Sequence, residues 1–462
     1  MANVFQSLQS IFKIPELKRR VLYTLGALIV YRIGGHVPTA GINGEALAAY
    51  FKQQQGSLLG LYDMFVGGAF SQATIFALGI MPYISASIIL QLFTAVIPYF
   101  EKLQKMGEEG RKKITQYTRY GTVLLALVQS YAAAAYIQSL PAIEGSPIVP
   151  TPGVSFILLT MLTMTTGTIF VMWLGEQISE RGVGNGISLI IFAGIVVGLP
   201  GAIVNTITDL RTGSMSIITV AILTVFMVLV VAAIVFMERS QRRIPIQYAK
   251  RVVGRRVYGG QSTYLPLRIN TGGVIPVIFA ASIMSFPQTL GQMIDHPWLR
   301  KITEALGWGE PLYNLVYFAS IVFFCYFYTS IIFNPEDTAE NMRKYGGFIP
   351  GIRPGKRTAE FIDKILTRIT LVGAVYLALV AILPQILISG FKVATIPFIG
   401  AGLDAVLPKW FTEGLGIKFF FGGTSLLIVV GVAMDTVQQI ESQLVMRHYD
   451  GFVRRGRIRG RR

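Results

Sequence analysis

Few side chains in this sequence of 462 residues are placed for covalent chemistry. Serines such as Ser85 and Ser188 lie in long apolar stretches that hold no histidine or lysine to act as a base, which disfavours an intramembrane serine protease. No G-x-x-x-x-G-K-[ST] loop for nucleotide phosphates occurs in the chain. We therefore expect no catalytic residue and no enzyme, and any energy source must lie outside this chain.

Metal ligands are equally sparse. The single cysteine, Cys325, lies within an apolar run, so neither a disulfide framework nor a cysteine-based zinc or iron-sulfur site is expected. The three histidines are far apart in the sequence, at His36, His296 and His448. We expect no metal ion and no cofactor.

The composition indicates a helical membrane protein. Hydrophobic residues make up 52% of the chain and charged residues 14%, whereas soluble domains are about a quarter charged. A search for apolar runs of about 20 residues, the length that crosses a bilayer as a helix, predicts ten spans. They lie near residues 21–38, 74–98, 118–139, 154–174, 187–207, 216–237, 273–294, 311–333, 369–389 and 418–440.

Lysine and arginine are concentrated on one side of these spans. The side that holds the N-terminus receives 33 of the 41 Lys and Arg residues. Because cytoplasmic loops carry the excess of basic residues, both termini are predicted to be cytoplasmic. The acidic residues divide 15 to 9, so the net charge of +17 is about +18 on that side and −1 elsewhere.

Two large basic loops and the tail carry much of this charge. The loop at 238–272 mixes basic residues with tyrosine, proline and glycine, which favours a large structured hairpin, and the loop at 334–368 is similar in size. With the basic tail at 441–462, they could bind RNA phosphates or an acidic protein surface. The alternative is that they hold only anionic lipid headgroups.

The span centres are almost free of charge. Arg32, Glu176 and Asp435 all fall near span ends, whereas ion-coupled transporters keep ionisable groups at mid-membrane depth. Ten spans also divide evenly into a half at 21–210 and a half at 211–440, after a cytoplasmic segment at 1–20. Two five-span halves could close around a central path, and a bundle without an opening is the alternative.

Five stretches of the sequence form a recognisable set. They are "FALGIMPYISASIILQL", "WLGEQISERGVGNGISLIIFAGIV", "QSTYLPLRINTGGVIPVIFA", "FNPEDTAENMRKYGGFIPGIRPG" and "FGGTSLLIVVGVAMD". In this order and topology they resemble the SecY family, whose members form the central channel of bacterial protein translocation. The resemblance implies an all-α polytopic membrane protein in the bacterial inner membrane, with ten transmembrane helices in two five-helix halves around a central pore. It implies a channel that passes unfolded secretory polypeptides and releases hydrophobic segments sideways into lipid.

The resemblance also implies a plug segment at residues 61–72, "LYDMFVGGAFSQ". In such channels this segment closes the external side of the pore and must be able to leave, and glycines would give it a displaceable backbone. The alternative is that the glycines allow close helix packing. The expected plug residues are Leu61, Tyr62, Met64, Phe65, Gly67, Gly68 and Phe70.

Six isoleucines correspond to the family's pore ring. A narrow ring of branched apolar side chains dewets and blocks ions while offering a translocating chain no polar group to hold it. The expected ring residues are Ile80, Ile84, Ile187, Ile191, Ile278 and Ile428. Taken singly, an isoleucine in an apolar helix is more often an ordinary packing residue, so the family correspondence alone selects these six.

A lateral gate between predicted spans two and three on one half and seven and eight on the other is implied in the same way. Its expected polar residues are Ser85, Ser87, Gln91, Asn185, Ser282 and Ser285. Polar contacts inside a membrane are worth about 0.6 to 2 kcal/mol each, which suits a gate that a signal sequence must open. The serines could equally be bonded to their own helix backbone without a gating role.

The partners implied by the family are the membrane subunits SecE and SecG, the SecA ATPase, the ribosome, signal sequences and nascent polypeptides. The expected docking residues are Lys250, Arg251, Arg255, Arg256 and Arg353. Two other functions stay open from the residues alone: a small-solute transporter, and a ribosome scaffold without a pore. One segment, 385–420, is longer than the family's usual external connection, and no function is assigned to it.

Overall fold

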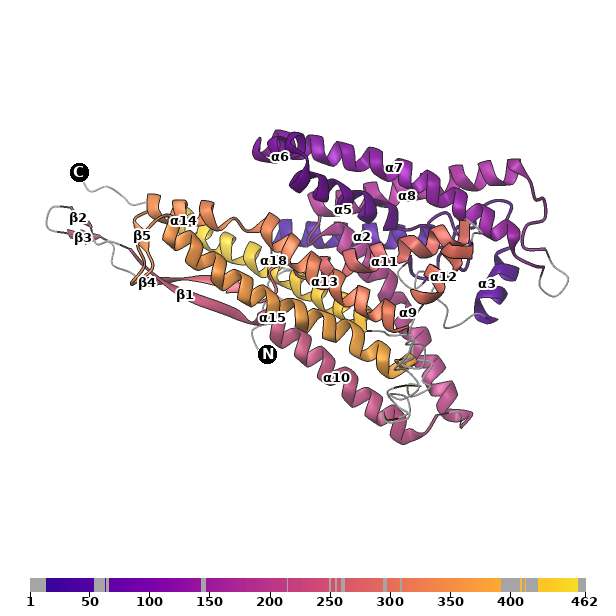
Figure 1. Cartoon of the computed structure of the whole chain (residues 1–462). Helices are drawn as coiled ribbons and strands as arrows, with labels where there is room; N and C mark the ends of the chain where they lie inside the picture. The colour runs from indigo at the N-terminus through magenta and orange to yellow at the C-terminus, as the bar shows by residue number, and fades with distance from the viewer. Residues whose placement is uncertain are drawn as a thin grey trace.

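The structure is a computed structural model of the chain. It describes residues 14–53, 63, 66–142, 147–213, 215–248, 251–253, 256–258, 262–293, 297–307, 310–391, 408, 412 and 423–455. Long helices dominate, and a small β region projects from one end (Figure 1). The all-helical membrane class predicted from composition is therefore confirmed.

A long helix lies at each of the ten predicted spans. These helices are α2 (Pro15–Gly34), α5 (Met81–Val96), α7 (Glu108–Ser139), α8 (Val154–Arg181), α9 (Gly186–Arg211), α10 (Ile217–Arg239), α11 (Ile275–Met293), α13 (Pro311–Ile332), α15 (Lys356–Ser389) and α18 (Gly423–Arg455). Shorter helices are α3 (Gly44–Gln53), α6 (Pro98–Lys105), α12 (Pro297–Ala305) and α14 (Pro335–Lys344).

Not all ten helices are long and apolar enough to cross a bilayer by themselves. Within the described residues seven satisfy that test, and α5 with α6, which meet at a bend of 96°, would make an eighth. The remaining two predicted spans correspond to α2, whose sequence carries basic residues at both ends, and α11, whose apolar part covers only Ile275–Ser285. The number ten stays a prediction from sequence and family.

The boundaries of the second predicted span were wrong. Helix α5 begins at Met81 rather than at residue 74, and residues 75–80 form turns. Pro82 occupies the first turn of α5, where proline's missing N–H costs nothing. It therefore starts the helix rather than interrupting it. The next break is at Pro98, which begins α6.

The helices pack mainly within two groups along the chain. In the first, α5 packs on α7, α7 on α8, and α8 on α9, with α2 against α8 and α9. In the second, α11 packs on α13, α13 on α15, and α15 on α18, with α10 against α18. The main contacts between the groups are those of α11 with α5 and α7, and of α18 with α9. Figure 1 shows the two groups side by side.

The first large basic loop is a β-hairpin, as predicted. Strand β1 (Gln241–Tyr248) pairs antiparallel with β4 (Ser262–Arg268), and β2 (Arg251–Val253) pairs with β3 (Arg256–Tyr258). The two loops are joined as well, because β5 (Gly347–Phe348) pairs with the end of β1. Ile244, Ile246 and Leu267 form a small core with Met342 and Ile362, which fixes both loops into one unit.

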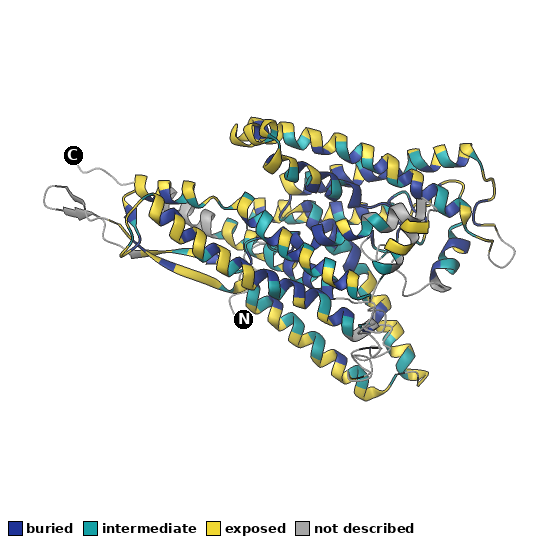
Figure 2. Ribbon diagram, viewed as in Figure 1, coloured by how far each residue is buried: buried dark blue, intermediate teal, exposed yellow. Residues whose placement is uncertain are grey.

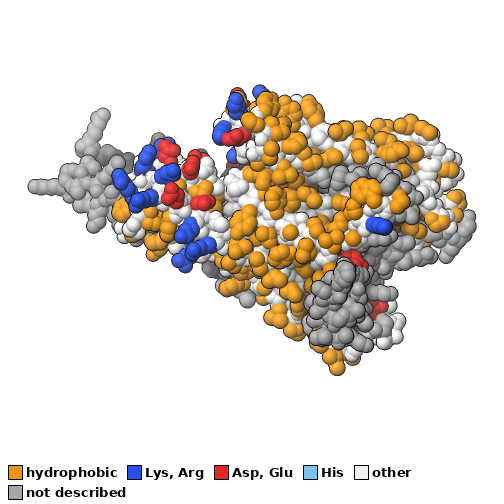
Figure 3. Space-filling model, in the orientation of Figure 1, with side chains coloured by type: hydrophobic (Ala, Val, Ile, Leu, Met, Phe, Trp, Pro, Cys, Tyr) orange, Lys and Arg blue, Asp and Glu red, His pale blue; other side chains and the backbone are white. Residues whose placement is uncertain are grey.

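Much of the second basic loop is helical. Helix α15 starts at Lys356, well before residue 369, and α14 occupies 335–344. Helix α18 likewise runs on to Arg455, through much of the predicted tail. Figure 3 shows most of the visible Lys and Arg side chains around the end of the molecule that carries the basic loops. Hydrophobic side chains cover the middle of the molecule.

The main core lies where the two groups of helices meet. It is built from buried residues of α5, α9, α11 and α18 together with α8, α13 and α15 (Figure 2). A second core, which contains Leu47, Phe51, Phe70 and Ala134, packs α3 and residues 66–78 against α7 and α8. It holds the residues that precede α5 in place.

Candidate functional site

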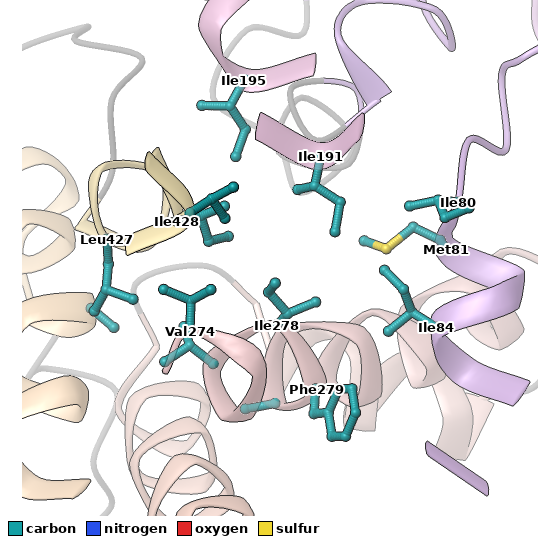
Figure 4. Packing of buried hydrophobic residues seen from close by; sticks show 14 of the residues in the cluster. Ile80, Met81, Ile84, Ile191, Ile195, Val274, Ile278, Phe279, Leu427 and Ile428 are labelled. Carbon is teal, nitrogen blue, oxygen red and sulfur yellow. The ribbon is translucent and has the colours of Figure 1, made fainter. Parts of the chain in front are cut away.

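Four of the six expected ring isoleucines surround one small space. Ile80, Ile84, Ile191 and Ile278 line it, and each is exposed by 6% or less. In Figure 4 they point toward one another from α9, α11, α5 and the residue just before α5. The space measures about 10 Å³. Since a water molecule needs at least roughly 10–15 Å³, these side chains leave room for one water molecule at most.

Three further residues line the same space, namely Val66, Met81 and Ala281. Sequence reasoning did not select them. Val66 lies in the plug segment, so that segment reaches the isoleucines directly. Met81 directly follows Ile80, and Ala281 lies one helical turn after Ile278. Either spacing could have identified these residues from the sequence.

The two remaining isoleucines differ from each other. Ile428 is fully buried in the core cluster and, in Figure 4, points from α18 into the interior that Ile195 enters from α9. Ile187 is only half-buried and lies beside α8. A Cβ added at Gly175 of α8 would be only 3.3 Å from the Cγ1 of Ile187. Ile195, one turn beyond Ile191, was missed by the sequence reasoning, although it has the same i, i+4 spacing.

The described part of the plug segment comprises Asp63 and residues 66–72, while Leu61, Tyr62, Met64 and Phe65 lie outside the described residues. Gly67 and Gly68 have φ of +73° and +80°, a region that favours glycine. Gly67 also lies against the backbone of Gly194 on α9, since an added Cβ would be 3.0 Å from the Gly194 Cα. The structure thus shows a left-handed backbone at both Gly67 and Gly68, and close packing against α9 at Gly67. Each of the two expectations for these glycines has a structural basis.

Polar contacts close the plug segment on itself. The Asp63 carboxylate accepts hydrogen bonds from the backbone N–H of Phe70 and of Ser71, both at 2.9 Å. Burial raises the pKa of Asp63 above its ordinary value, although these hydrogen bonds act in the opposite direction. Phe70 is anchored by an edge-to-face contact with Phe51 of α3, with ring centroids 5.6 Å apart.

Helix α2 makes two further hydrogen bonds to the plug segment. The Tyr31 hydroxyl donates to the Val66 carbonyl at 3.4 Å, and Arg32 Nη1 donates to the Gly67 carbonyl at 3.3 Å. The plug segment is thus held both by its own turn and by its neighbour.

The contact of α5 with α11 brings together part of the expected gate. Ser282 is buried, and its hydroxyl lies 3.8 Å from Met81 Sδ across this contact. Ser282 also donates to the Ile278 carbonyl at 2.9 Å, and Ser285 donates to the Ser282 carbonyl at 2.8 Å. Both serines are therefore bonded to their own helix backbone.

The expected gate residues of α5 are half-buried. Gln91 Nε2 donates to the Ser87 hydroxyl at 3.2 Å within the helix, and Ser85 lies two residues before Ser87. Asn185 is placed differently. It is the N-cap of α9, where its side chain accepts from the N–H groups of Ile187 and Ser188. Helix α9 packs mainly on α8, α18 and α2, so Asn185 does not join the α5–α11 contact.

The expected docking residues are only partly described. Lys250 and Arg255 lie outside the described residues, while Arg251 and Arg256 are placed by their backbone in β2 and β3. Arg353 is exposed in the turn before α15, and its carbonyl accepts from the Thr358 hydroxyl at 3.0 Å. In the part of the chain that the structure describes, no group of three or more His, Cys, Asp or Glu side chains could hold a metal ion.

Known proteins match this chain over nearly its whole length. The SecY family matches residues 74–437. The protein translocase subunit SecY of Escherichia coli strain K12 is 47% identical over 449 residues, which cover 96% of each chain. Such identity over that length is strong evidence of common descent.

Two solved structures show the same fold. One is a SecY whose plug domain is described as stabilising the closed state of the translocation channel and maintaining a membrane seal, with a TM-score of 0.62, 19% identity and coverage of 93% of this chain and 92% of that one. The other is Sec61 in the canine ribosome-channel complex from the endoplasmic reticulum, with a TM-score of 0.58, 17% identity and 93% coverage of both chains. From its sequence match, its identity to the curated relative and this shared fold, the chain belongs to the SecY family of protein translocase subunits.

Proposed function

We propose that this SecY-family channel subunit conducts unfolded polypeptide between its two groups of helices, through the space that Ile80, Ile84, Ile191 and Ile278 surround. The observation that carries the proposal is the meeting of these side chains from α5, α9 and α11 around about 10 Å³. Their position where the two groups of helices meet, beside Val66 of the plug segment, favours a path over a bundle without an opening. The small-solute transporter is not favoured by the relatives, which are translocase subunits.

The constriction would seal by dewetting. Its lining is formed by aliphatic side chains and Met81, so ions would lose their hydration without gaining a ligand. A polypeptide that enters would push the side chains apart and meet no polar group. Ile428 and Ile195 would extend the seal on the side of α18 and α9, and Ile187 would contribute least, because it lies beside α8.

Hydrophobic segments would leave between α5 and α11. Helix α11 contacts both α5 and α7, and Ser282 meets Met81 through a weak hydroxyl–sulfur contact of 3.8 Å. The serines are otherwise satisfied within α11, so separating the helices would leave few polar groups without a partner. This makes the contact suitable for opening by a signal sequence.

The energy would come from partners on the cytoplasmic side. We propose that the unit formed by β1, β4, β5 and the turn at Arg353 binds the ribosome or the SecA ATPase, and that the nearby basic residues also hold anionic lipid. Sec61, a neighbour in fold, is found in a ribosome complex. SecE and SecG are proposed as further membrane subunits. Both termini would face the cytoplasm of a bacterium, with the chain in the inner membrane.

Ion conductance of the purified translocase in planar bilayers tests this function. We expect the unaltered channel to be silent, and the deletion of residues 61–72 or the double change of Ile84 and Ile191 to glycine to conduct. Ile222→Gly is the matched control, because this isoleucine is 59% exposed on α10, away from the constriction. If the deletion and the double variant are both silent despite correct insertion, the central path is refuted and the scaffold reading returns.

A further inference from the structure

Arg32 occupies an unusual place for a cation. It lies in the last turn of α2 and lines an open cavity of about 400 Å³ between α2, α9 and the plug segment. Among the described residues of that lining, Arg32 alone carries a charge, and its neighbours include Leu28, Phe192 and Val197. Charged side chains in apolar membrane surroundings are costly unless they pair with another charge or with a backbone carbonyl.

The Gly67 carbonyl supplies such a partner. Arg32 Nη1 lies 3.3 Å from it, and the preceding carbonyl, that of Val66, accepts from the Tyr31 hydroxyl at 3.4 Å. Two successive carbonyls of the plug segment are thus bound by two successive residues of α2. The close approach of Gly67 to Gly194 places these carbonyls within reach of α2.

The plug segment is built so that this contact acts on all of it. The Asp63 carboxylate holds the N–H groups of Phe70 and Ser71, and the Asp63 carbonyl accepts from the Gly68 N–H at 2.8 Å. Residues 63 and 66–71 are therefore connected as one closed turn. A force on the Gly67 carbonyl is transmitted to Val66, which lines the constriction.

We propose that Arg32 is a positioning residue that favours the seated plug segment, by donating to the Gly67 carbonyl. This inference rests on the proposed function, since it presupposes that the segment closes the path. When the segment leaves, the guanidinium and the carbonyl both lose this hydrogen bond, and the guanidinium is left against apolar side chains. The seated position is favoured by that difference.

The test is the resting conductance of the reconstituted translocase with Arg32→Met, Arg32→Lys and the control Arg19→Met. Arg19 is an exposed residue on the cytoplasmic end of the same helix, so it undergoes the same chemical change without touching the plug segment. Because a hydrogen bond to a charged group is worth more than a neutral one, we expect Arg32→Met to raise the open probability about ten-fold. Arg32→Lys should restore most of the closure, and Arg19→Met should stay silent.

A double-mutant cycle separates positioning from a general structural role. If Arg32 acts through the plug segment, Arg32→Met should change nothing further in a channel that lacks residues 61–72. If the deletion variant conducts but Arg32→Met is silent, this inference alone is overturned. The same holds if Arg32→Met raises the conductance equally in the full-length channel and in the channel that lacks residues 61–72. A silent deletion variant overturns this inference, because the segment would then not close the path, and the proposed function falls with it only if the double variant of Ile84 and Ile191 is silent as well. If Arg32→Met fails to accumulate in the membrane, the resting conductance of Arg32→Gln, which keeps N–H donors, is compared with that of Arg32→Leu, which has none.

Discussion

Replacing Gly67 by alanine should displace the plug segment, whereas the same change at Gly68 should not. Both glycines have a left-handed backbone, with φ of +73° and +80°. Their surroundings differ. A Cβ at Gly67 would lie 3.0 Å from the Cα and 3.1 Å from the carbonyl oxygen of Gly194, and at Gly68 nothing lies within 4 Å. The pair therefore separates backbone strain from packing against α9.

The two effects have similar sizes but act on different equilibria. An L-residue in the left-handed region costs roughly 1–2 kcal/mol, and this strain persists in a displaced segment that keeps its turn. Overpacking typically costs about 1–3 kcal/mol, and the obstacle at Gly194 is backbone, which cannot rotate away. That cost exists only while the segment is seated. Since about 1.4 kcal/mol is a factor of ten, Gly67→Ala should favour the displaced segment by about 5- to 140-fold over Gly68→Ala.

The assay is single-channel conductance of each variant in the reconstituted translocase, with membrane accumulation measured in parallel. Gly67→Ala should show frequent openings, and Gly68→Ala should remain close to the unaltered channel. Equal opening frequencies in the two variants would contradict a role for the Gly194 contact, because backbone strain alone would then explain the effect. A silent Gly67→Ala would show that the contact with Gly194 does not hold the segment.

Two further predictions concern stability and the gate. Arg119 forms a two-pronged ion pair with Glu176 across α7 and α8, with Nε to Oε1 at 2.9 Å and Nη2 to Oε2 at 2.8 Å. The Arg119 side chain is 48% exposed but that of Glu176 only 13%, so Glu176→Gln should lower the free energy of unfolding by about 1–2 kcal/mol, above the value of a fully exposed pair. A loss above about 3 kcal/mol in thermal unfolding would contradict this. Asn185→Ala should lower the free energy of unfolding by about 1 kcal/mol, because α9 loses its N-cap, and should leave the resting conductance unchanged. A variant that conducts at rest without any loss of stability would support a gating role for Asn185.

Several features could be predicted from the sequence because they depend on local composition. The apolar runs placed a helix at each of the ten spans, since a bilayer demands about 20 apolar residues whatever the tertiary fold. The tyrosines, prolines and glycines of the loop at 238–272 predicted its hairpin. Local signals also misled. The apolar run predicted a second span from residue 74, whereas α5 begins only at Met81, with Pro82 in its first turn, where proline fits.

The candidate site depended on the family correspondence and on tertiary contacts. An isoleucine such as Ile278 is indistinguishable in sequence from any other apolar residue in its helix. Val66 carries no signal of its own, and the i, i+4 spacing of Ile195 from Ile191 does not by itself select it. Asn185 looked like a polar gate residue, but an asparagine before a helix is also a common N-cap, and only the packing of α9 distinguishes the two.

The order of apolar and basic residues is sufficient to predict a helical membrane protein with one strongly basic side, because hydropathy and charge act residue by residue. Which side chains meet depends instead on how the helices pack. Helices α5, α9 and α11 are far apart in the chain, and their isoleucines come within one small space solely through packing. The same holds for Arg32 and the Gly67 carbonyl, 35 residues apart, since nothing in the local sequence of either specifies the other.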